Sequence, residues 1–387
     1  MRVLTLHYLY IIAILFYTAV SCREIELVSF IEEEQVTTPT SQVSIEGLYL
    51  LNEGNMGSNK CTLDYLDLNS DSPNAGTYYR NIYGNRNPNT VMELGDVGND
   101  LGIYGQRLWM VINCSNKVEV CEACTAQRIG QVNIANCRYL AFHHEYAYIS
   151  SYAGPVQIDE NTCLGRVYKV DTLTLEKVDS LTVGYQPEEM AISNGKLFVT
   201  NSGGYRVPNY DNRIFVIDLN TFTVEREIAV EINLHRIAVD RRGTIWVSSR
   251  GDYFNTPSKL CWIAPDNTQG HIDRSVSVMS LVGDSLYCMG TSFSYLTGNY
   301  EKSLFIVDVV SRKVIETSLF DAPEIANMQM PYGLLVNPMS RDFYLMDAKN
   351  CVSSGELLHF TSSGQFDWKV RTGDIPSRGC FLFKAVN

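Results

Sequence analysis

Six segments of this 387-residue chain gather side chains that suit ligand recognition. Together they are rich in Tyr, Asn, Ser and Gly, and two of them contain an arginine. The segments are 52–60, 150–165, 201–212, 248–258, 290–302 and 347–355. Tyrosine and phenylalanine offer flat apolar area, while amide and guanidinium groups beside them donate hydrogen bonds. This combination favours binding, because aromatic side chains and arginine dominate binding hot spots. For any single residue, the alternative is a structural role in a turn. The predicted ligand-binding residues are Asn52, Asn113, Tyr152, Asn201, Tyr205, Arg206, Tyr210, Arg250, Tyr253, Phe254, Phe293, Tyr295 and Tyr332.

A second set of residues combines acids, bases and tyrosines. Its members are Asp100, Tyr139, Glu188, Glu189, His235, Arg236 and Tyr332. Glu189, His235 and Arg236 could form an acid/base group. The favoured alternative is structural, with each carboxylate paired to an arginine from a neighbouring repeat. The sequence contains no Gly-x-Ser-x-Gly elbow, His-Glu-x-x-His helix or phosphate loop, so we predict a protein that is not an enzyme.

Metal-ligand patterns in the sequence are incomplete. Residues 209–212 and 159–161 supply oxygen ligands but lack the spacing of a calcium loop, and ordinary turns explain both. Cys121 and Cys124 resemble half of a zinc ribbon whose other half is missing. Cys121 also occupies a repeat position that is apolar elsewhere, which favours a core thiol or a local disulfide over a metal ligand. We predict no metal site and no resident cofactor.

A repeating pattern of short strands must position these residues. Residues 186–230 contain four apolar runs separated by turn signals, and the alternation of two of them is typical of a four-stranded antiparallel unit. Units about 40 to 55 residues apart are typical of propellers. The sequence therefore predicts an all-β fold, a seven-bladed β-propeller. The second run recurs with an aromatic in its middle at 48–50, 108–110, 147–149, 197–199, 245–247, 286–288 and 343–345.

The ends of the repeat array predict how the ring closes. The first unit lacks an innermost strand before Gly47, and one spare apolar run, 379–383, follows the last unit. We predict that this C-terminal run completes the first blade, so that a propeller at 47–387 has no exposed inner edge. The six ligand-binding segments join second and third strands and therefore share one face, where the central channel also opens.

The N-terminal region has the pattern of an exported protein. Residues 1–22 combine an apolar run with small residues before Cys22, as in a signal peptide. The ending Ala-Val-Ser-Cys resembles a bacterial lipobox, in which Cys22 is lipidated, although Ala19 stands where leucine is preferred. The alternative is a plain signal peptide with an incidental cysteine. Residues 23–46 carry an acidic run and Pro, Ser and Thr, which predicts a flexible tether.

Charge and cysteine content restrict the partners and the compartment. The net charge of -12 argues against a nucleic-acid partner, because no basic stripe is present to neutralise phosphates. Apart from Cys22, ten of the eleven cysteines remain. An exported protein meets oxidising conditions, so we expect disulfides, and Cys114 with Cys137 is the pair we predict first.

The sequence pattern of the repeats, such as NGKLFVTN followed by NRIFVIDLNT, resembles that of YncE-like, surface-layer-type propellers. With the lipobox and the acidic residues after Cys22, the chain resembles a Bacteroidetes surface lipoprotein of that group. The BtuG-type cobalamin-binding lipoproteins are the functional subgroup that it resembles. This resemblance implies capture of cobalamin or a related corrinoid and its transfer to a TonB-dependent transporter of the outer membrane. Contact with the membrane is then expected only through the lipid anchor, with the propeller facing the cell exterior.

Other functions remain open from the sequence. One is a surface propeller that binds another nutrient, a glycan or a protein partner. Another is a metal-dependent lactonase-like enzyme, because propellers also host enzymes.

Overall fold

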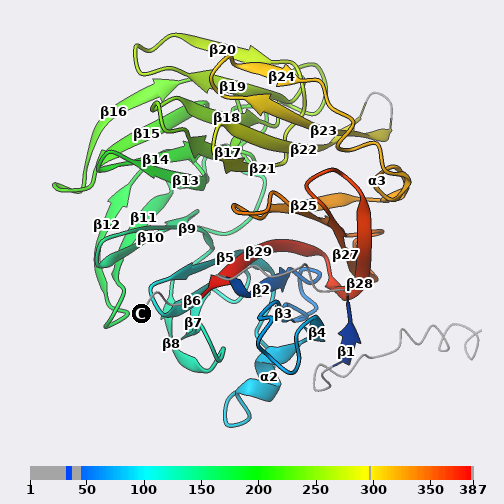
Figure 1. The fold of residues 1–387 in the computed structure, drawn as a ribbon. Helices are drawn as coiled ribbons and strands as arrows, with labels where there is room; N and C mark the ends of the chain where they lie inside the picture. Colours follow the sequence, from blue (N-terminus) through cyan, green and yellow to red (C-terminus); the bar gives the residue numbers. More distant parts are fainter. Residues whose placement is uncertain (1–31, 37–44, 296–297, 385–387) are drawn as a thin grey trace, which may run out of the picture.

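The computed structural model describes residues 32–36, 45–295 and 298–384. The predicted signal peptide, Cys22 and most of the predicted tether lie outside the described residues. The described chain forms seven antiparallel sheets arranged in a ring (Figure 1). The prediction of an all-β, seven-bladed propeller is confirmed.

Six of the sheets follow the chain in order, each beginning at the innermost strand. Blade two consists of β5 (Gly98–Tyr104), β6 (Arg107–Ile112), β7 (Lys117–Glu122) and β8 (Arg128–Asn133). Blade three consists of β9 (Cys137–His143), β10 (Tyr146–Ser151), β11 (Arg166–Asp171) and β12 (Lys177–Thr182). Blade four consists of β13 (Pro187–Ser193), β14 (Lys196–Asn201), β15 (Arg213–Asp218) and β16 (Thr223–Ala229). Blade five consists of β17 (Leu234–Val239), β18 (Ile245–Ser249), β19 (Lys259–Ile263) and β20 (Gln269–Ile272). Blade six consists of β21 (Val278–Val282), β22 (Ser285–Ser294), β23 (Asn299–Asp308) and β24 (Lys313–Ile315). Blade seven consists of β25 (Pro331–Val336), β26 (Phe343–Asp347), β27 (Ser354–Phe360) and β28 (Phe366–Asp374).

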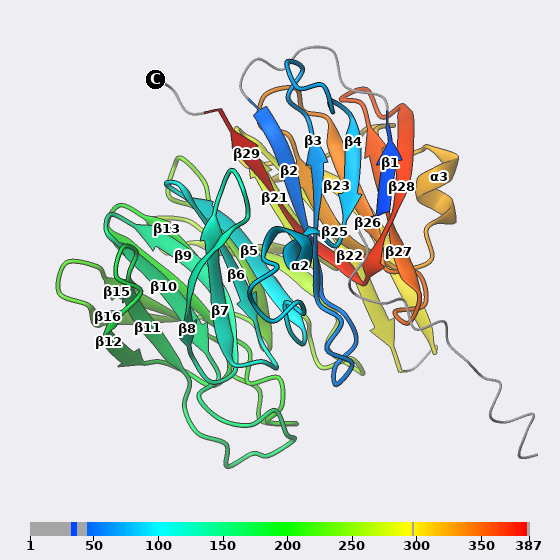
Figure 2. The same cartoon turned by 90° about the horizontal axis from the view of Figure 1, so that it is seen from below.

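Blade one joins the two ends of the chain, as predicted. Its inner strand is the C-terminal β29 (Pro376–Phe383), which pairs with β2 (Ile45–Asn52) and places Leu48 opposite Phe381. The strands β3 (Thr62–Asp67) and β4 (Thr77–Arg80) follow outward. Figure 2 shows the red β29 lying beside the blue β2, so the ring is closed by backbone hydrogen bonds.

The edge of blade one differs from the prediction. β1 (Glu32–Gln35), which falls in the predicted tether, pairs with β4 and covers its outer edge. The tether prediction is therefore wrong for these four residues. All four are exposed, and the charged side chains suit an edge strand because they discourage pairing with another chain.

The repeated aromatic position explains why the sequence pattern recurs. In all seven blades the side chain is at most 8% exposed. Each one packs in a hydrophobic cluster that contains strands of the next blade around the ring. Burial of such a ring stabilises the fold by roughly 1.5–3 kcal/mol, so the slot supplies the contact between blades. The residues are Tyr49, Trp109, Tyr148, Phe198, Trp246, Tyr287 and Tyr344.

Two connections differ from simple loops. The segment between the second and third strands of blade six, expected to be a loop, instead extends β22 and β23 into a long hairpin with Phe293 opposite Tyr300. Aromatic residues alternate with polar residues there, and such cross-strand aromatic pairs favour pairing. The short helices α2 (Ile82–Arg86) and α3 (Pro323–Asn327) lie between blades one and two and between blades six and seven, respectively.

Candidate ligand-binding site

The innermost strands of blades three, four and five share one irregularity in register. In β13, Pro187 pairs with Asn201 and Met190 pairs with Val199, so two residues are fitted where the partner strand has one. β9 and β17 have the same shift. Bulges of this kind re-aim side chains and are common beside functional sites. The bulged pairs are Arg138 with Tyr139, Glu188 with Glu189, and His235 with Arg236.

Hydroxyl side chains on the neighbouring strands satisfy the backbone of these bulges. The backbone N–H of Tyr139 donates to Ser150 Oγ over 3.1 Å, and that of Arg236 donates to Ser248 Oγ over 3.0 Å. In blade four, Thr200 Oγ1 donates to the carbonyl of Glu189 over 2.8 Å. The bulges are thus fixed features that hold six polar side chains at the channel.

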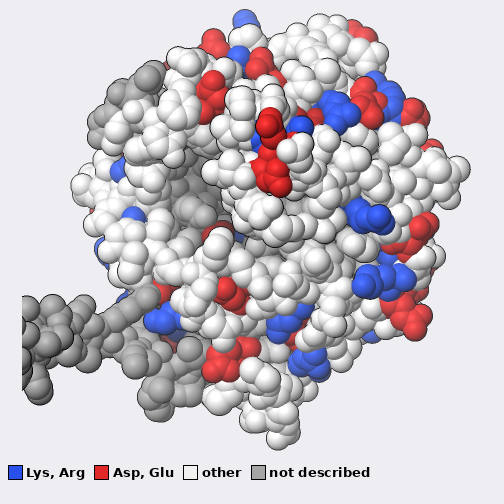
Figure 3. Space-filling view, turned by 180° about the vertical axis from the view of Figure 1, so that it is seen from behind, with Lys and Arg blue, Asp and Glu red and all other residues white. Residues whose placement is uncertain are grey.

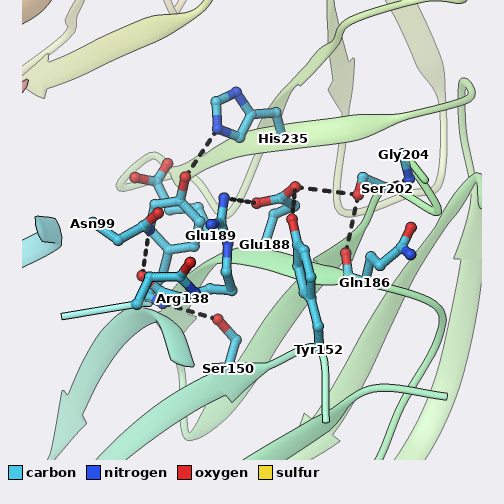
Figure 4. A network of polar contacts seen from close by, with 12 residues as sticks. Asn99, Arg138, Ser150, Tyr152, Gln186, Glu188, Glu189, Ser202, Gly204 and His235 are labelled. Carbon is cyan, nitrogen blue, oxygen red and sulfur yellow. Dashed lines mark hydrogen bonds and ion pairs between the residues drawn. The ribbon is translucent and has the colours of Figure 1, made fainter. Parts of the chain in front are cut away.

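Glu188 is the centre of a buried cluster at the channel mouth (Figure 4). Its Oε1 accepts hydrogen bonds from Tyr152 Oη at 2.7 Å, Arg250 Nη1 at 3.1 Å and Ser202 Oγ at 3.2 Å. Its Oε2 lies 3.4 Å from Arg138 Nη2. Burial opposes ionisation, but Arg250 and Arg138 outweigh it and hold the pKa of Glu188 below its usual value. Arg138, Glu188 and Arg250, here called the cavity floor, therefore carry two cations and one carboxylate.

Glu189, the next residue, belongs to a different group of charges. Its Oε1 lies 2.9 Å from Arg378 Nη2 and 3.5 Å from Arg236 Nη1, and its Oε2 accepts the Ile237 N–H over 3.0 Å. Arg378 also lies 3.5 Å from Asp100. Burial raises the pKa of Glu189, against the opposing effect of Arg378. Glu189, Arg236, Arg378 and Asp100 form what we call the channel network, and the structural alternative foreseen for Glu189 is confirmed.

His235 is neutral in this environment. Its Nε2 lies 3.0 Å from Tyr139 Oη, and burial together with Arg250, Arg378 and Arg138 lowers its pKa well below the usual value. Among the described residues, its Nδ1 has no hydrogen-bond partner.

Above the cavity floor lies a cavity of about 450 Å³, the tyrosine cavity. It opens on the face that carries the connections between second and third strands, here called the long-loop face. Its lining residues come from the loops of blades three, four and five and from the blade-six hairpin. Ile158 and Val207 add apolar area and are 76% and 43% exposed. The lining residues are Arg138, Tyr152, Ile158, Glu188, Gly204, Tyr205, Val207, Tyr210, Arg250, Tyr253, Phe254 and Tyr295.

An aromatic cluster forms one wall of the tyrosine cavity. Phe254 and Tyr295 stack with ring centroids 4.9 Å apart and planes 13° apart. Phe293 meets Tyr295 edge to face at 5.0 Å. The Tyr295 N–H donates to the Tyr253 carbonyl over 3.3 Å and so links the hairpin to blade five. Phe254 and Tyr295 remain 53% and 61% exposed, so their faces are accessible to a ligand.

Seven predicted binding residues are brought together in this cavity. They are Tyr152, Tyr205, Tyr210, Arg250, Tyr253, Phe254 and Tyr295.

The three asparagines predicted to bind ligand have structural roles instead. Asn52 donates to Thr62 and Asp64, Asn201 donates to two backbone carbonyls, and Asn113 donates to Asn136 and the Cys137 carbonyl. All three are at most 3% exposed. Their amide groups are therefore buried and bonded to protein atoms, so the structure places all three outside the tyrosine cavity.

Arg206 joins two loops rather than facing the cavity. It donates to the carbonyls of Glu160 at 3.1 Å and Asn209 at 2.8 Å, and its guanidinium lies 3.7 Å from the Tyr185 ring centroid. It therefore fixes the blade-three loop against the blade-four loop.

The remaining two predicted residues lie outside the tyrosine cavity. Tyr332 donates to Glu53 over 3.1 Å on another side of the channel, where burial raises the pKa of Glu53 to about 7. Phe293 lies behind Tyr295 and lines a neighbouring depression.

The cysteines are free throughout the described residues, so the predicted disulfide between Cys114 and Cys137 is not formed. The Cys137 thiol is buried and donates to the Lys117 carbonyl over 3.3 Å. Cys121 is buried in the core, at the position equivalent to Ile217. Among the described residues, no group of three His, Cys, Asp or Glu is placed to hold a metal ion.

Three charged residues of the channel and the cavity floor were missed from the sequence. Arg138 precedes Tyr139, and the bulge that turns both toward the channel has no sequence signature of its own. Arg378 lies on the C-terminal strand, so the predicted closure of blade one could have located it. Glu53 directly follows the buried strand β2 and could have been found by comparing strand ends.

The fold and the cavity define a seven-bladed β-propeller with a concave, aromatic site on its long-loop face. The chain matches the family described as Domain of unknown function (DUF5074) over residues 46–356, and it belongs to that family. No curated protein matches it. Within the described residues, no helix is both long and apolar enough to cross a membrane.

Several solved structures share the fold. A candidate 6-phosphogluconolactonase from Bacteroides fragilis is 10% identical with a TM-score of 0.59, covering 89% of this chain and 100% of the other. A quinoprotein alcohol dehydrogenase-like protein from Bacteroides thetaiotaomicron is 14% identical with a TM-score of 0.55, covering 88% and 79%. A hypothetical selenium-binding protein from Sulfolobus tokodaii is 10% identical with a TM-score of 0.56, covering 87% and 94%. At these identities the likeness is one of fold.

Proposed function

We propose that this propeller captures a corrinoid such as cobalamin in the tyrosine cavity and passes it to a TonB-dependent transporter of the outer membrane. The observation that carries the proposal is the position of the cavity, where aromatic faces from four blades surround two partly free arginines. We propose further that Cys22 is lipidated and that the propeller faces the cell exterior. The sequence before Cys22 supports this anchor.

The cavity suits a broad ring whose rim carries amides. Tyrosine and phenylalanine faces pack against a flat ring, while their hydroxyl groups reach its polar edge. A rigid site lowers the entropic cost of binding, and bulges with satisfied backbones make this site rigid.

The arginines of the cavity floor can donate to a ligand. A guanidinium has five N–H donors, and among the described residues Arg138 and Arg250 share one carboxylate, Glu188. Arg138 Nε is buried and has no partner among the described residues. Amide carbonyls on a ring's rim are acceptors that would use such donors.

The protonation states support binding rather than catalysis. Glu188 is held as an anion by two arginines, Glu189 is paired in the channel network, and His235 is neutral. On the face drawn in Figure 3, acidic and basic side chains are interspersed over a mostly uncharged surface.

Cobalamin is red, which allows a direct test. The chain from residue 23 onward is mixed with cyanocobalamin and passed through a gel-filtration column, with absorbance followed at visible wavelengths. We expect the colour to elute with the protein, and less colour with Tyr253→Ala, because Tyr253 lines the cavity. Tyr168→Ala, a partly exposed position on β11 outside the cavity, is the matched control.

Elution of all the colour with free cyanocobalamin would reject the corrinoid. The same column run with a glycan or protein partner would then address the alternative of a different surface ligand. A lactonase-like enzyme would instead need a chelator-sensitive hydrolysis of lactones by the purified chain.

A further inference from the structure

A second depression of about 490 Å³ adjoins the tyrosine cavity between blades five and six. Arg250, Tyr253 and Phe254 line both spaces, so one ligand can extend from one into the other. We propose that this depression, the anion depression, binds a phosphate ester carried by the ligand whose ring occupies the tyrosine cavity. The inference rests on the proposed function and specifies its ligand further. The residues beyond those three are Asn255, Thr256, Pro257, Ser258, Asp273, Arg274, Ser275, Phe293, Lys302 and Ser303.

The charges of the anion depression are unusual for a chain with a net charge of -12. Arg274, Lys302 and Arg250 face a single acid, Asp273. The Asp273 side chain is 80% exposed and lies 3.4 Å from His271, so water screens it strongly. Arg250 is already paired with Glu188, but Arg274 and Lys302 meet only this screened carboxylate in the lining, so the space keeps a net positive charge.

Arg274 has no anionic partner in the part of the chain that the structure describes. Its guanidinium lies 5.1 Å from the ring centroid of the buried Phe305, which fixes the side chain over an aromatic face. That contact uses the face of the guanidinium and leaves its N–H groups free to donate. A phosphate can accept two parallel hydrogen bonds from such a group.

Lys302 is held near the same space and keeps donors free. Its Nζ donates one hydrogen bond to the Met328 carbonyl over 2.7 Å, and an ammonium has two further donors. The hydroxyl groups of Ser258 and Ser303 already donate to backbone carbonyls at 2.7 and 2.9 Å. Arg274 and Lys302 are the charged donors of the depression, beside the neutral groups of Asn255 and Ser275, and this set favours an anion as the acceptor.

The anion depression continues inward into a recess of about 110 Å³. His235 lies at its inner wall, 6% exposed, with Nδ1 unpartnered among the described residues. Since a water molecule takes about 30 Å³ of liquid volume, the recess holds a group of a few atoms and excludes a ring. The recess can therefore take a small substituent of the ligand, whereas a corrin ring and its cobalt cannot enter it.

Cobalamin combines both chemistries that the two spaces select. Its corrin ring is broad and edged with amides, and its nucleotide tail is joined through a phosphodiester. Cobinamide has the same ring and lacks the nucleotide. We therefore expect the anion depression to contribute to the binding of cobalamin and not to that of cobinamide.

The test compares cyanocobalamin with dicyanocobinamide by calorimetric titration. In the double variant Arg274→Gln, Lys302→Gln, we expect cyanocobalamin to bind at least tenfold more weakly and dicyanocobinamide to bind as in the parent protein. Glutamine keeps a donor for the Met328 carbonyl and removes the charge. Arg312→Gln is the matched control, because Arg312 also lies over an aromatic ring, 4.1 Å from the Trp262 centroid, on the opposite face. Equal weakening of both corrinoids, or of neither, would overturn the inference.

A second arm separates this inference from the corrinoid proposal. Adenosine 5′-monophosphate and adenosine are titrated against the same proteins by NMR line broadening. We expect the monophosphate to bind more strongly than adenosine, and the difference to disappear in the double variant. If no corrinoid binds but this difference is found, the corrinoid proposal fails and the phosphate subsite stands. If the phosphate adds nothing to binding, the phosphate subsite is rejected.

Discussion

The cavity floor and the channel network lie next to each other, yet their charges are balanced differently. In the cavity floor, Arg138 and Arg250 share one carboxylate, Glu188, whose pKa is lowered. In the channel network, Arg378 and Arg236 face Glu189 and Asp100, and burial raises the pKa of both carboxyls, that of Asp100 to about 6.

This difference separates a binding surface from a structural one. The channel network satisfies its own charges and closes the centre of the ring, where strands from blades one, two, four and five meet. The cavity floor has surplus donors directed at an open cavity. Glu188 and Glu189 are adjacent residues of the bulged strand β13. The bulge places Glu188 in the cavity floor and Glu189 in the channel network.

The largest expected effect is a loss of stability when the ion pairs of the channel network are broken. Arg378→Met leaves Glu189 and Asp100 without their shared cation, and we expect the free energy of unfolding to fall by about 3–5 kcal/mol at pH 8. Arg242→Met, which breaks an exposed pair with Asp284, should cost less than about 1 kcal/mol. Urea unfolding measures both, and equal losses would contradict a structural role for the channel network.

A substitution in the cavity floor should weaken ligand binding strongly and lower stability only moderately. Arg250→Met removes a central donor, so we expect binding of cyanocobalamin to weaken by about 2–4 kcal/mol, or 30- to 1,000-fold. Stability should fall less than in Arg378→Met, because Glu188 keeps Arg138, Tyr152 and Ser202. Calorimetry and urea unfolding of the same samples check this, and unchanged affinity would show that the cavity floor is structural.

The raised pKa values predict how stability depends on pH. The folded protein keeps protons on Glu53, with a pKa of about 7, and Asp100, with a pKa of about 6, which the unfolded chain releases above about pH 4.3. Their contribution is therefore present at low pH and is lost as the pH rises from about 4 to 7.

Removing the Glu53 carboxyl isolates that effect. Glu53→Gln can still accept a hydrogen bond from Tyr332, and it should flatten the fall in stability between pH 5 and 7 by at most about 1.4 kcal/mol per pH unit. Thermal unfolding across this range measures the slope, with the exposed Glu316→Gln as control. A slope identical to that of the parent protein would contradict the raised pKa.

The smallest expected effect is on ligand affinity, for a substitution at the rim of the tyrosine cavity. Phe254 is 53% exposed and stacks on Tyr295, so Phe254→Ala should weaken binding of cyanocobalamin by about 0.5–1.5 kcal/mol, or two- to tenfold. A loss as large as that in Arg250→Met would move the centre of the site from the cavity floor to the aromatic wall. The same calorimetric series measures it.

The fold could be predicted because its requirements repeat. The aromatic slot of Tyr49 and Trp246 recurs since every blade must pack against the next, and the spare run 379–383 had one place to pair. The pairing of Glu189 with an arginine was expected because a carboxylate of one repeat can pair with an arginine of the neighbouring repeat. Repetition made each of these requirements visible in a single sequence.

The site could be predicted only in part. Tyr253 and Arg250 lie on long loops and reach the cavity as expected. Asn201 was misplaced because burial by the neighbouring blade depends on where a strand ends, and Arg138 was missed because a bulge is a change of register. Neither property has a local sequence signature.

Calorimetric titration of the chain from residue 23 onward with cyanocobalamin tests the central claim most directly. The account predicts a saturable one-to-one heat with a Kd in the low nanomolar range or tighter, and a much weaker one for Arg250→Met. Absence of heat at micromolar protein would contradict corrinoid capture by this propeller.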